Sequence, residues 1–315
     1  MMPVTDQLHA PTTDGIETVA LVSSDGNLRA AFAPSAGMVC CSLRHRGEEL
    51  LAQRDGVRAY AERGSTMGVP LLHPWANRLA GFTYGAPPHV VALAEDSPLI
   101  ALDDNGLPIH GVIAGNLPWE VREAAAKRLR PRMRWEQLAL LTLFPFPHTL
   151  DFEALIGDDT LRIETTLRPS SDLAVPVSFG YHPYLTIPET SRDSWQVELP
   201  VTRRLLLDAH MIPTGRSEPV DCARFELEES SWDHAFGGLA RPSRFAVSAA
   251  GRRVEVEFLE GYPYAQVFSP SGENFICFEP MAAQTNALVS GIDLPVVVPG
   301  EEFRATFRIS VAEER

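Results

Sequence analysis

Apolar and polar residues alternate along three stretches of the chain, at positions 161–169, 252–261 and 301–310. A period of two places every second side chain on the same face of a strand, so the pattern predicts strands with one buried face. The residues expected on the buried faces are Leu161, Ile163, Thr165 and Leu167 in the first stretch, Val254, Val256 and Phe258 in the second, and Phe303, Ala305 and Phe307 in the third.

Turn signals separate these and other apolar runs. The chain has 26 prolines and 22 glycines, and segments such as SSDGN, DDNG and VVPGEE punctuate it. Helical periodicity is scarce, and residues 120–130 are the best helical candidate by composition. With no internal repeat or linker, we predict an all-β fold. It would be a single large antiparallel β-sandwich over residues 17–315, rather than a small barrel, after a loose lead-in at residues 1–16.

The charge of the chain limits its partners. Net charge is −14, from 27 basic and 41 acidic residues of 315, without a basic stripe. This balance disfavours nucleic acid, anionic membranes and polyanionic substrates, and favours a small neutral ligand. Lys127, the only lysine, lies in a charged run, so Schiff-base, pyridoxal-phosphate and P-loop enzymes are not expected.

The spacing of the cysteines and the length of the apolar runs indicate the cellular compartment. The four cysteines are Cys40, Cys41, Cys222 and Cys277, and their spacing shows neither a disulfide framework nor a CxxC motif. The N-terminal residues lack a signal-peptide pattern, and the longest nearly apolar run, LALLTLFPFP, is too short to span a bilayer. We expect a cytoplasmic protein without a membrane anchor.

Three histidines stand in distinctive settings. His182 lies between two tyrosines in SFGYHPYLTIP, His110 precedes a glycine in GLPIHGVIAG, and His73 precedes a proline in GVPLLHPWANRLAG. A histidine near neutrality can give and take a proton, although this stretch taken alone favours His182 as a hydrogen-bonded structural residue of an aromatic cluster. No two histidines or cysteines have zinc-site spacing, so no metal site is expected.

Glu279, Asp233 and Arg78 are the other candidates. Glu279 ends an apolar run in NFICFEPM, where burial would raise the pKa of its carboxyl; alternatively, it caps a backbone N–H. Asp233 lies between Trp232 and Phe236, a setting suited to a sugar, but it could instead begin a turn. Arg78 offers a planar fork of donors, or an ordinary surface ion pair.

Five segments, in order, resemble the aldose 1-epimerase (galactose mutarotase) family in its broad bacterial branch, from about residue 17 onward. They are PWANRLAGFTYG, IHGVIAGNLPWEV, SFGYHPYL, SWDHAF and FEPMAAQTNAL. The resemblance implies a galactose-mutarotase-like β-sandwich, often called a supersandwich, with one open carbohydrate cleft.

The resemblance also implies roles for individual residues. Glu279 would take the proton of the anomeric hydroxyl and His182 would protonate the ring oxygen, so that the sugar opens and recloses on either face. Arg78 and His110 would hold the sugar near its ring oxygen, and Asp233 would bind hydroxyls. Asn77 belongs to the segment that supplies Arg78. The implied reaction is an isomerisation of a small neutral monosaccharide without a cofactor.

Two departures from the family pattern leave the substrate open. Phe179-Gly180-Tyr181 replaces a more polar segment, and Met281 stands where glutamine is frequent; both positions are expected to border the sugar. A hexose-phosphate 1-epimerase is one alternative, which would need arginines converging on a phosphate. The other is a carbohydrate-binding or regulatory protein without turnover, although such a protein would not need both His182 and Glu279.

Overall fold

The computed structural model describes residues 9–86, 89–220 and 223–313, and most of its regular structure is antiparallel β-sheet. A nine-stranded sheet is the largest layer. Its strands, in spatial order, are β11 (Trp119–Ala125), β12 (Arg128–Trp135), β13 (His148–Ile156), β14 (Thr160–Pro169), β28 (Phe303–Glu313), β24 (Arg252–Glu260), β23 (Ser243–Ala249), β18 (Gln196–Leu199) and β21 (Ala223–Glu226).

An eight-stranded sheet is the second layer. Its order is β20 (Pro213–Pro219), β19 (Arg203–Leu207), β22 (Trp232–Gly237), β25 (Tyr264–Ser269), β26 (Ile276–Met281), β16 (Gly180–Tyr181) and β6 (Leu71–Leu72), with β17 (Tyr184–Leu185) also paired to β26.

A five-stranded sheet lies beside the eight-stranded one. It consists of β1 (His9–Thr13), β2 (Ile16–Val22), β3 (Leu28–Ala33), β4 (Val39–His45) and β5 (Glu48–Glu49). Three pairs of short strands complete the β-structure: β7 (Thr83–Ala86) with β8 (His89–Ala92), β9 (Ile100–Leu102) with β10 (Pro108–Val112), and β15 (Val175–Pro176) with β27 (Val296–Val297). The α-helices are α1 (Gly56–Arg63), α2 (Leu138–Leu141) and α3 (Ala287–Ser290).

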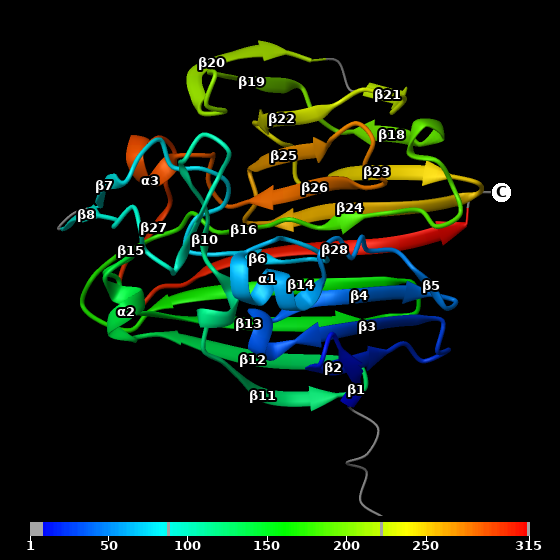
Figure 1. The fold of residues 1–315 in the computed structure, drawn as a ribbon, viewed down its shortest axis with the longest axis horizontal. Helices are drawn as coiled ribbons and strands as arrows, with labels where there is room; N and C mark the ends of the chain where they lie inside the picture. Colours follow the sequence, from blue (N-terminus) through cyan, green and yellow to red (C-terminus); the bar gives the residue numbers. More distant parts are fainter. Residues whose placement is uncertain (1–8, 87–88, 221–222, 314–315) are drawn as a thin grey trace, which may run out of the picture.

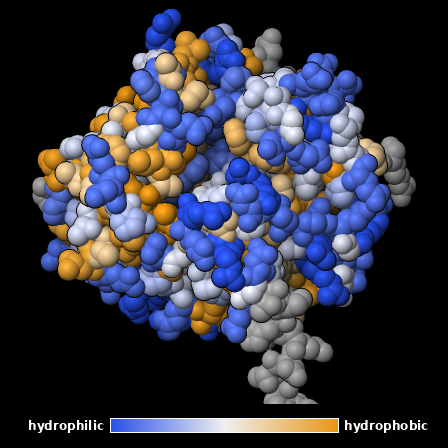
Figure 2. Space-filling view, viewed as in Figure 1, coloured by the Kyte–Doolittle hydropathy of each residue, from blue (hydrophilic) through white to orange (hydrophobic). Residues whose placement is uncertain are grey.

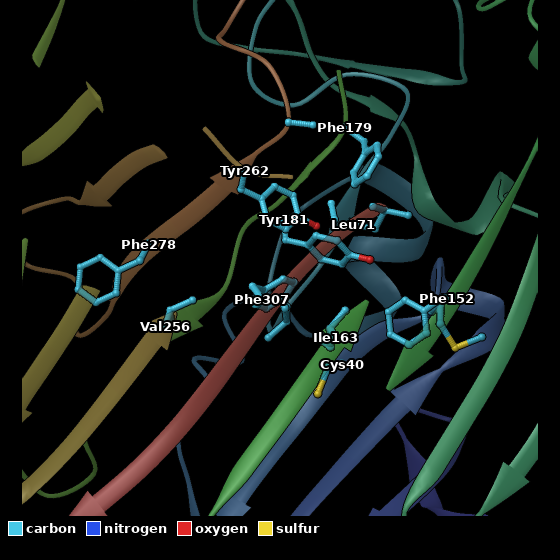
Figure 3. Close-up of a cluster of buried hydrophobic side chains, with 14 of the residues drawn as sticks. Cys40, Leu71, Phe152, Ile163, Phe179, Tyr181, Val256, Tyr262, Phe278 and Phe307 are labelled. Atoms are coloured by element: carbon cyan, nitrogen blue, oxygen red, sulfur yellow. The ribbon is translucent and has the colours of Figure 1, made fainter. Parts of the chain in front are cut away.

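The two smaller sheets pack on the same face of the nine-stranded sheet, which gives the sandwich (Figure 1). Phe32 of β3 contacts Phe152 of β13 edge to face at 5.7 Å, and Phe278 of β26 lies 5.6 Å from Phe245 of β23. Figure 3 shows the buried side chains that join the layers, including Phe152, Phe278 and Phe307. The predicted all-β antiparallel sandwich is confirmed.

The alternating stretches form strands with the predicted buried faces. In β14, Leu161, Ile163, Thr165 and Leu167 are all fully buried, and in β24 and β28 the predicted residues are buried except for the half-buried Phe303. Burial of these rows against the opposite sheets supplies the hydrophobic stabilisation of the sandwich.

The best helical candidate by composition, residues 120–130, is not helical. The segment contains most of β11 and the start of β12, which pair as a hairpin with a bulge between Val121 and Glu123. Pro131 lies opposite Val121 at this bulge, where a missing N–H is tolerated. The expected loose lead-in is also shorter than predicted, because residues 9–13 form β1 on β2; residues 1–8 lie outside the described residues.

Exposed apolar side chains gather at one end of the molecule. Figure 2 shows them on the left, over the region that Figure 1 labels α2, α3, β8 and β27. The residues are Val90, Leu138, Val289, Ile292, Val296 and Val298. Among the described residues, none of the helices is both long and apolar enough to cross a bilayer.

Candidate active site

One face of the eight-stranded sheet packs in the core, and the opposite face presents the candidate residues. Glu279 of β26 lies directly opposite Gln266 of β25, and Asp233 of β22 lies directly opposite Phe268 of β25. Opposed residues of antiparallel strands point to the same side, as do residues two apart on one strand. Glu279, Gln266 and Asp233 therefore share a face.

His182 joins this face from the short connection between β16 and β17. Gly180 pairs with Met281 and Tyr184 pairs with Cys277, so both flanks of the connection are fixed against β26. The His182 N–H donates to the carbonyl of Pro70 at 3.2 Å. This anchoring places His182 Nε2 3.3 Å from Glu279 Oε1, with side chains only 5% and 2% exposed.

Burial makes both groups reactive toward proton exchange. It raises the pKa of the Glu279 carboxyl well above its usual range; Asp233 adds to the rise and Arg78 opposes it. Burial lowers the pKa of the His182 imidazole well below its usual range, and His110 and Arg54 lower it further. A carboxylate here takes up a proton readily, and an imidazolium here gives one up readily.

Aromatic contacts fix the His182 ring on two sides. Tyr184 stacks parallel to it at 4.4 Å with an interplanar angle of 4°, and the His110 ring meets it edge to face at 5.4 Å. The hydroxyl of Tyr184 lies 2.6 Å from Thr66 Oγ1 and accepts a hydrogen bond from Arg54 at 3.3 Å. The His182 ring therefore has little freedom to turn.

The loop after β6 and strand β10 bring Arg78 and His110 together. The His110 N–H donates to the Asn77 carbonyl at 2.9 Å, and Arg78 forms an isolated bridge with Ile109. Next to His110, the backbone passes so close that a Cβ on Gly111 would lie 2.2 Å from the carbonyl oxygen of His73. Burial, with a contribution from Arg78, lowers the pKa of His110 to about 3, so its ring is neutral at pH 7.

Arg78 is held by a buried ion pair. Its Nε donates to Asp103 Oδ2 at 2.6 Å and its Nη1 donates to Asn77 Oδ1 at 3.1 Å, with the Arg78 side chain 16% exposed. Asp103 also accepts the N–H groups of Asn105 and Leu107, each at 2.9 Å. The alternative of an ordinary surface pair is excluded, because the Asp103 side chain is 4% exposed.

Asp233 lies within β22 and accepts a hydrogen bond from Gln266 Nε2, so it does not begin a turn. Burial raises the pKa of its carboxyl, against the opposing effects of Gln266 and Arg78. The sequence led us to expect that the neighbouring aromatic residues would flank Asp233 in a sugar site, and they do not. Trp232 and Phe236 project from the other face of the strand, and the aromatic side chain on the face of Asp233 is Phe268.

Four buried polar atoms of this cluster have no hydrogen-bond partner among the described residues. They are Glu279 Oε2, His182 Nδ1, His110 Nδ1 and Gln266 Oε1. Buried polar groups are normally paired, so unpaired ones are candidates for contacts with a ligand. Glu279 is therefore not a cap for a backbone N–H, which was the alternative interpretation from sequence.

The structure brings together all six predicted site residues. Arg78 is within electrostatic range of His110, His182, Asp233 and Glu279. His73, the third distinctive histidine, lies outside this group and pairs with His148 in the core. Within the described ranges, no group of three or more His, Cys, Asp or Glu side chains is arranged to hold a metal ion.

The residues that depart from the family pattern do not all face the site. Phe179 and Tyr181 were expected to border the sugar, but both point into the main core, where Figure 3 shows them near Tyr262 and Phe307. Tyr181 is tied there by a 2.6 Å hydrogen bond to Thr165. They face the core because their strand alternates, which leaves Gly180 and His182 on the face of the site.

Sequence reasoning missed several residues of the site, among them Gln266, Asp103 and Tyr184. Tyr184 had a signal, since it is two residues from His182 and must share its face if the segment is extended. Asp103 stood in a segment that indicated only a turn. Gln266 is a polar residue within an otherwise apolar and aromatic strand, and such residues are worth testing as site residues.

Comparison with known proteins identifies the family of the chain. Residues 21–310 match the family model described as aldose 1-epimerase. The protein YihR of Escherichia coli, which carries the description uncharacterized, is 25% identical over 265 residues, or 76% of this chain and 80% of that one.

Solved structures share the fold over the whole chain. A galactose mutarotase-like protein of Clostridium acetobutylicum superposes with a TM-score of 0.82 at 18% identity, covering 97% of this chain and 98% of that one. The Slr1438 protein of Synechocystis superposes with a TM-score of 0.77 at 24% identity, with both chains covered completely. The architecture is therefore that of galactose mutarotase-like proteins.

Proposed function

Because the chain belongs to the aldose 1-epimerase family, we propose that it interconverts the α and β anomers of a free aldose. The observation that supports this activity is the buried pair of Glu279 and His182, 3.3 Å apart, with unpaired polar atoms on both side chains. Mutarotation needs one base and one acid acting on the two oxygens bonded to the anomeric carbon, and this pair can supply both.

The proposed reaction conserves the protons of the pair. In the reactive form of the pair the shared proton is on His182: the Glu279 carboxylate takes the proton of the C1 hydroxyl while the His182 imidazolium gives its proton to the ring oxygen. The C1–O5 bond breaks and the C1 carbonyl forms, leaving protonated Glu279 and neutral His182. After rotation about C1–C2, the O5 hydroxyl adds to the other face of the carbonyl, and both protons return.

The remaining residues bind the sugar in this proposal. Neutral His110 and the guanidinium of Arg78, held by Asp103, contact oxygens near the reacting bond. Asp233, with Gln266, accepts hydroxyl hydrogen bonds, and Asn77 orients Arg78. No residue in this scheme requires a metal or an organic cofactor.

Polarimetry tests the proposal. Freshly dissolved α-anomers of several aldoses should reach equilibrium rotation faster with the protein than without it, and dialysis against EDTA should leave the rate unchanged. Acceleration that disappears after EDTA and returns with a divalent ion would refute the cofactor-free reaction. Unaltered rotation curves for all sugars would leave a binding or regulatory protein as the better interpretation.

A further inference from the structure

The face that carries Glu279 continues across four more strands. Glu279 of β26 is opposite Gln266 of β25, which is opposite Ala235 of β22, which is opposite Leu205 of β19, which is opposite Ser217 of β20. The five side chains therefore form one row on one face. With neighbouring strands about 4.8 Å apart, Leu205 lies roughly 14 Å along the sheet from Glu279.

A hollow of about 160 Å³ lies at the far end of this row. Leu205, Ser217 and Tyr264 reach it from the sheet, and Tyr264 is opposite Met281, one row from Glu279. The hydroxyl of Tyr264 donates to Asp293 Oδ2 at 2.6 Å, which ties the loop after α3 to the wall of the hollow.

The lining combines hydrogen-bond donors with apolar surface. Arg203 and Arg216 line the hollow, and neither has a carboxylate within ion-pair distance among the described residues. Leu205, Pro213 and Ile292 supply apolar surface. Hydroxyls at the edge and C–H groups on the faces of a pyranose ring match such a lining.

The size of the hollow also fits a ring. A volume of about 160 Å³ is many times the roughly 15 Å³ that holds one water molecule. It exceeds what a phosphoryl group alone would fill, so the observations favour a sugar unit over an anionic substituent.

We propose that this hollow binds a second pyranosyl unit, so that the preferred substrate is a reducing disaccharide whose reacting ring lies at Glu279 and His182. The inference rests on the proposed function. Only a ring with a free anomeric hydroxyl can open, so the second unit is attached through another hydroxyl of the reacting aldose. It then extends along the row toward Leu205 and Ser217.

The test compares two sugars that have the same reacting ring. α-Lactose and α-glucose both open a glucose ring, and lactose adds a galactosyl unit on its O4. Polarimetry should give a kcat/KM at least about tenfold higher for α-lactose, since the extra contacts add binding energy. α-Glucose 6-phosphate, which has the same ring with an anionic group, should show no such advantage.

Variants test whether the advantage of lactose arises from binding in the hollow. Ser217→Trp places a large ring in the hollow and should remove the advantage of lactose while leaving the glucose rate nearly unchanged. Thr202→Trp adds the same ring at an exposed position just before β19, outside the lining, and should leave both rates unchanged. Arg216→Ala, at an exposed side chain, should reduce the lactose advantage several-fold if Ser217→Trp does not fold.

Several outcomes would overturn the inference. Equal kcat/KM for lactose and glucose would do so, as would equal slowing of both sugars by Ser217→Trp in a folded protein. Preference for glucose 6-phosphate over lactose would assign the arginines to an anion. Anomerisation of glucose without a lactose advantage refutes only this inference, whereas no anomerisation of any sugar refutes the proposed function itself.

Discussion

The proposed chemistry depends on the environments of single side chains. Glu279 and His182 are both buried and touch each other, and burial favours the neutral form of each. Groups this close titrate as a pair, so the proton that they share belongs to both. Their opposite pKa shifts favour transfer of a proton out of His182 and into Glu279, which is the direction that ring opening requires.

Removing either member of the pair should abolish most turnover. His182→Asn and Glu279→Gln keep the approximate shapes but cannot transfer the proton, so each should lower kcat by about 10²-fold or more. The double variant should be little slower than the worse single one, because the two residues act as a unit. Stopped-flow polarimetry on the pure variants measures these rates.

Glu301→Gln is the matched control, at an exposed acid of the turn before β28, and it should keep near-normal turnover. Circular dichroism should show all variants folded. Near-normal kcat in folded His182→Asn would return His182 to a structural role in its aromatic cluster.

Asp233 should affect both binding and pH dependence. Asp233→Asn removes an acceptor for sugar hydroxyls and should raise KM more than it lowers kcat. Because the Asp233 charge raises the pKa of Glu279, its removal should lower that pKa and move the acidic limb of kcat/KM to lower pH. A limb that stays in place, or moves to higher pH, would contradict this coupling.

The sequence predicted the residues whose local motif carries their chemistry. His182, Glu279, Arg78 and Asp233 stand in segments recognisable on their own, and the structure brings them together. Gln266 could not be predicted, because its place beside Asp233 depends on the register of β22 and β25, which are separated by intervening chain. Register is set by packing of the whole sheet rather than by a local pattern.

Among the structural elements, the close passage of the His73 and Gly111 backbones positions His110. Gly111 has a φ of 73°, and an added Cβ would lie 2.2 Å from the His73 carbonyl oxygen. The adjoining His110 also has a positive φ, of 62°. A change at Gly111 therefore moves the bridge that holds His110 next to His182.

Gly111→Ala should destabilise the protein and impair the site. The left-handed backbone alone costs about 1–2 kcal/mol for alanine, and the steric clash adds to it. Gly106→Ala is the matched control, since Gly106 has the same φ of 73° with open space around it. Thermal unfolding should show a larger loss for Gly111→Ala, and a loss no larger than that of the control would refute the clash.

Strand prediction succeeded where one face is buried and failed where it is not. In β14 the alternation follows directly from burial on one side. In β11, by contrast, most side chains are exposed, so its charged composition resembled a solvated helix. Hydrogen bonding to β12 outweighs the local helical preference there, and single-segment composition does not contain that information.

At the scale of the whole molecule, two neutral histidines lie in the core between the layers. His148 Nδ1 donates to the Phe146 carbonyl at 2.6 Å, so its Nε2 accepts from His73 Nε2 at 2.9 Å. Both rings pack against Trp135. Burial lowers the pKa of His148 to about 4 and that of His73 well below its usual range.

This pair should make the fold acid-sensitive. The pKa of His148 is lower when folded than when unfolded, so protonation favours unfolding, and stability falls as pH drops from about 6.5 toward about 4. The shift corresponds to a loss of about 3 kcal/mol for His148. Urea unfolding at several pH values measures it. His73→Leu/His148→Leu removes both polar partners and should reduce the slope of stability against pH, leaving the contribution of the buried His110 and His182; an unchanged slope would contradict this origin.

β28 lies between β14 and β24 at the centre of the nine-stranded sheet, although it follows both of them in the chain. During synthesis, β14 and β24 therefore each have an unpaired edge until residues 303–313 have been made. Unpaired edges of this kind are templates for pairing between chains. The nine-stranded sheet is thus complete only after β28 has been translated. A longer interval between synthesis of β24 and of β28 gives the unpaired edges more time to pair with another chain.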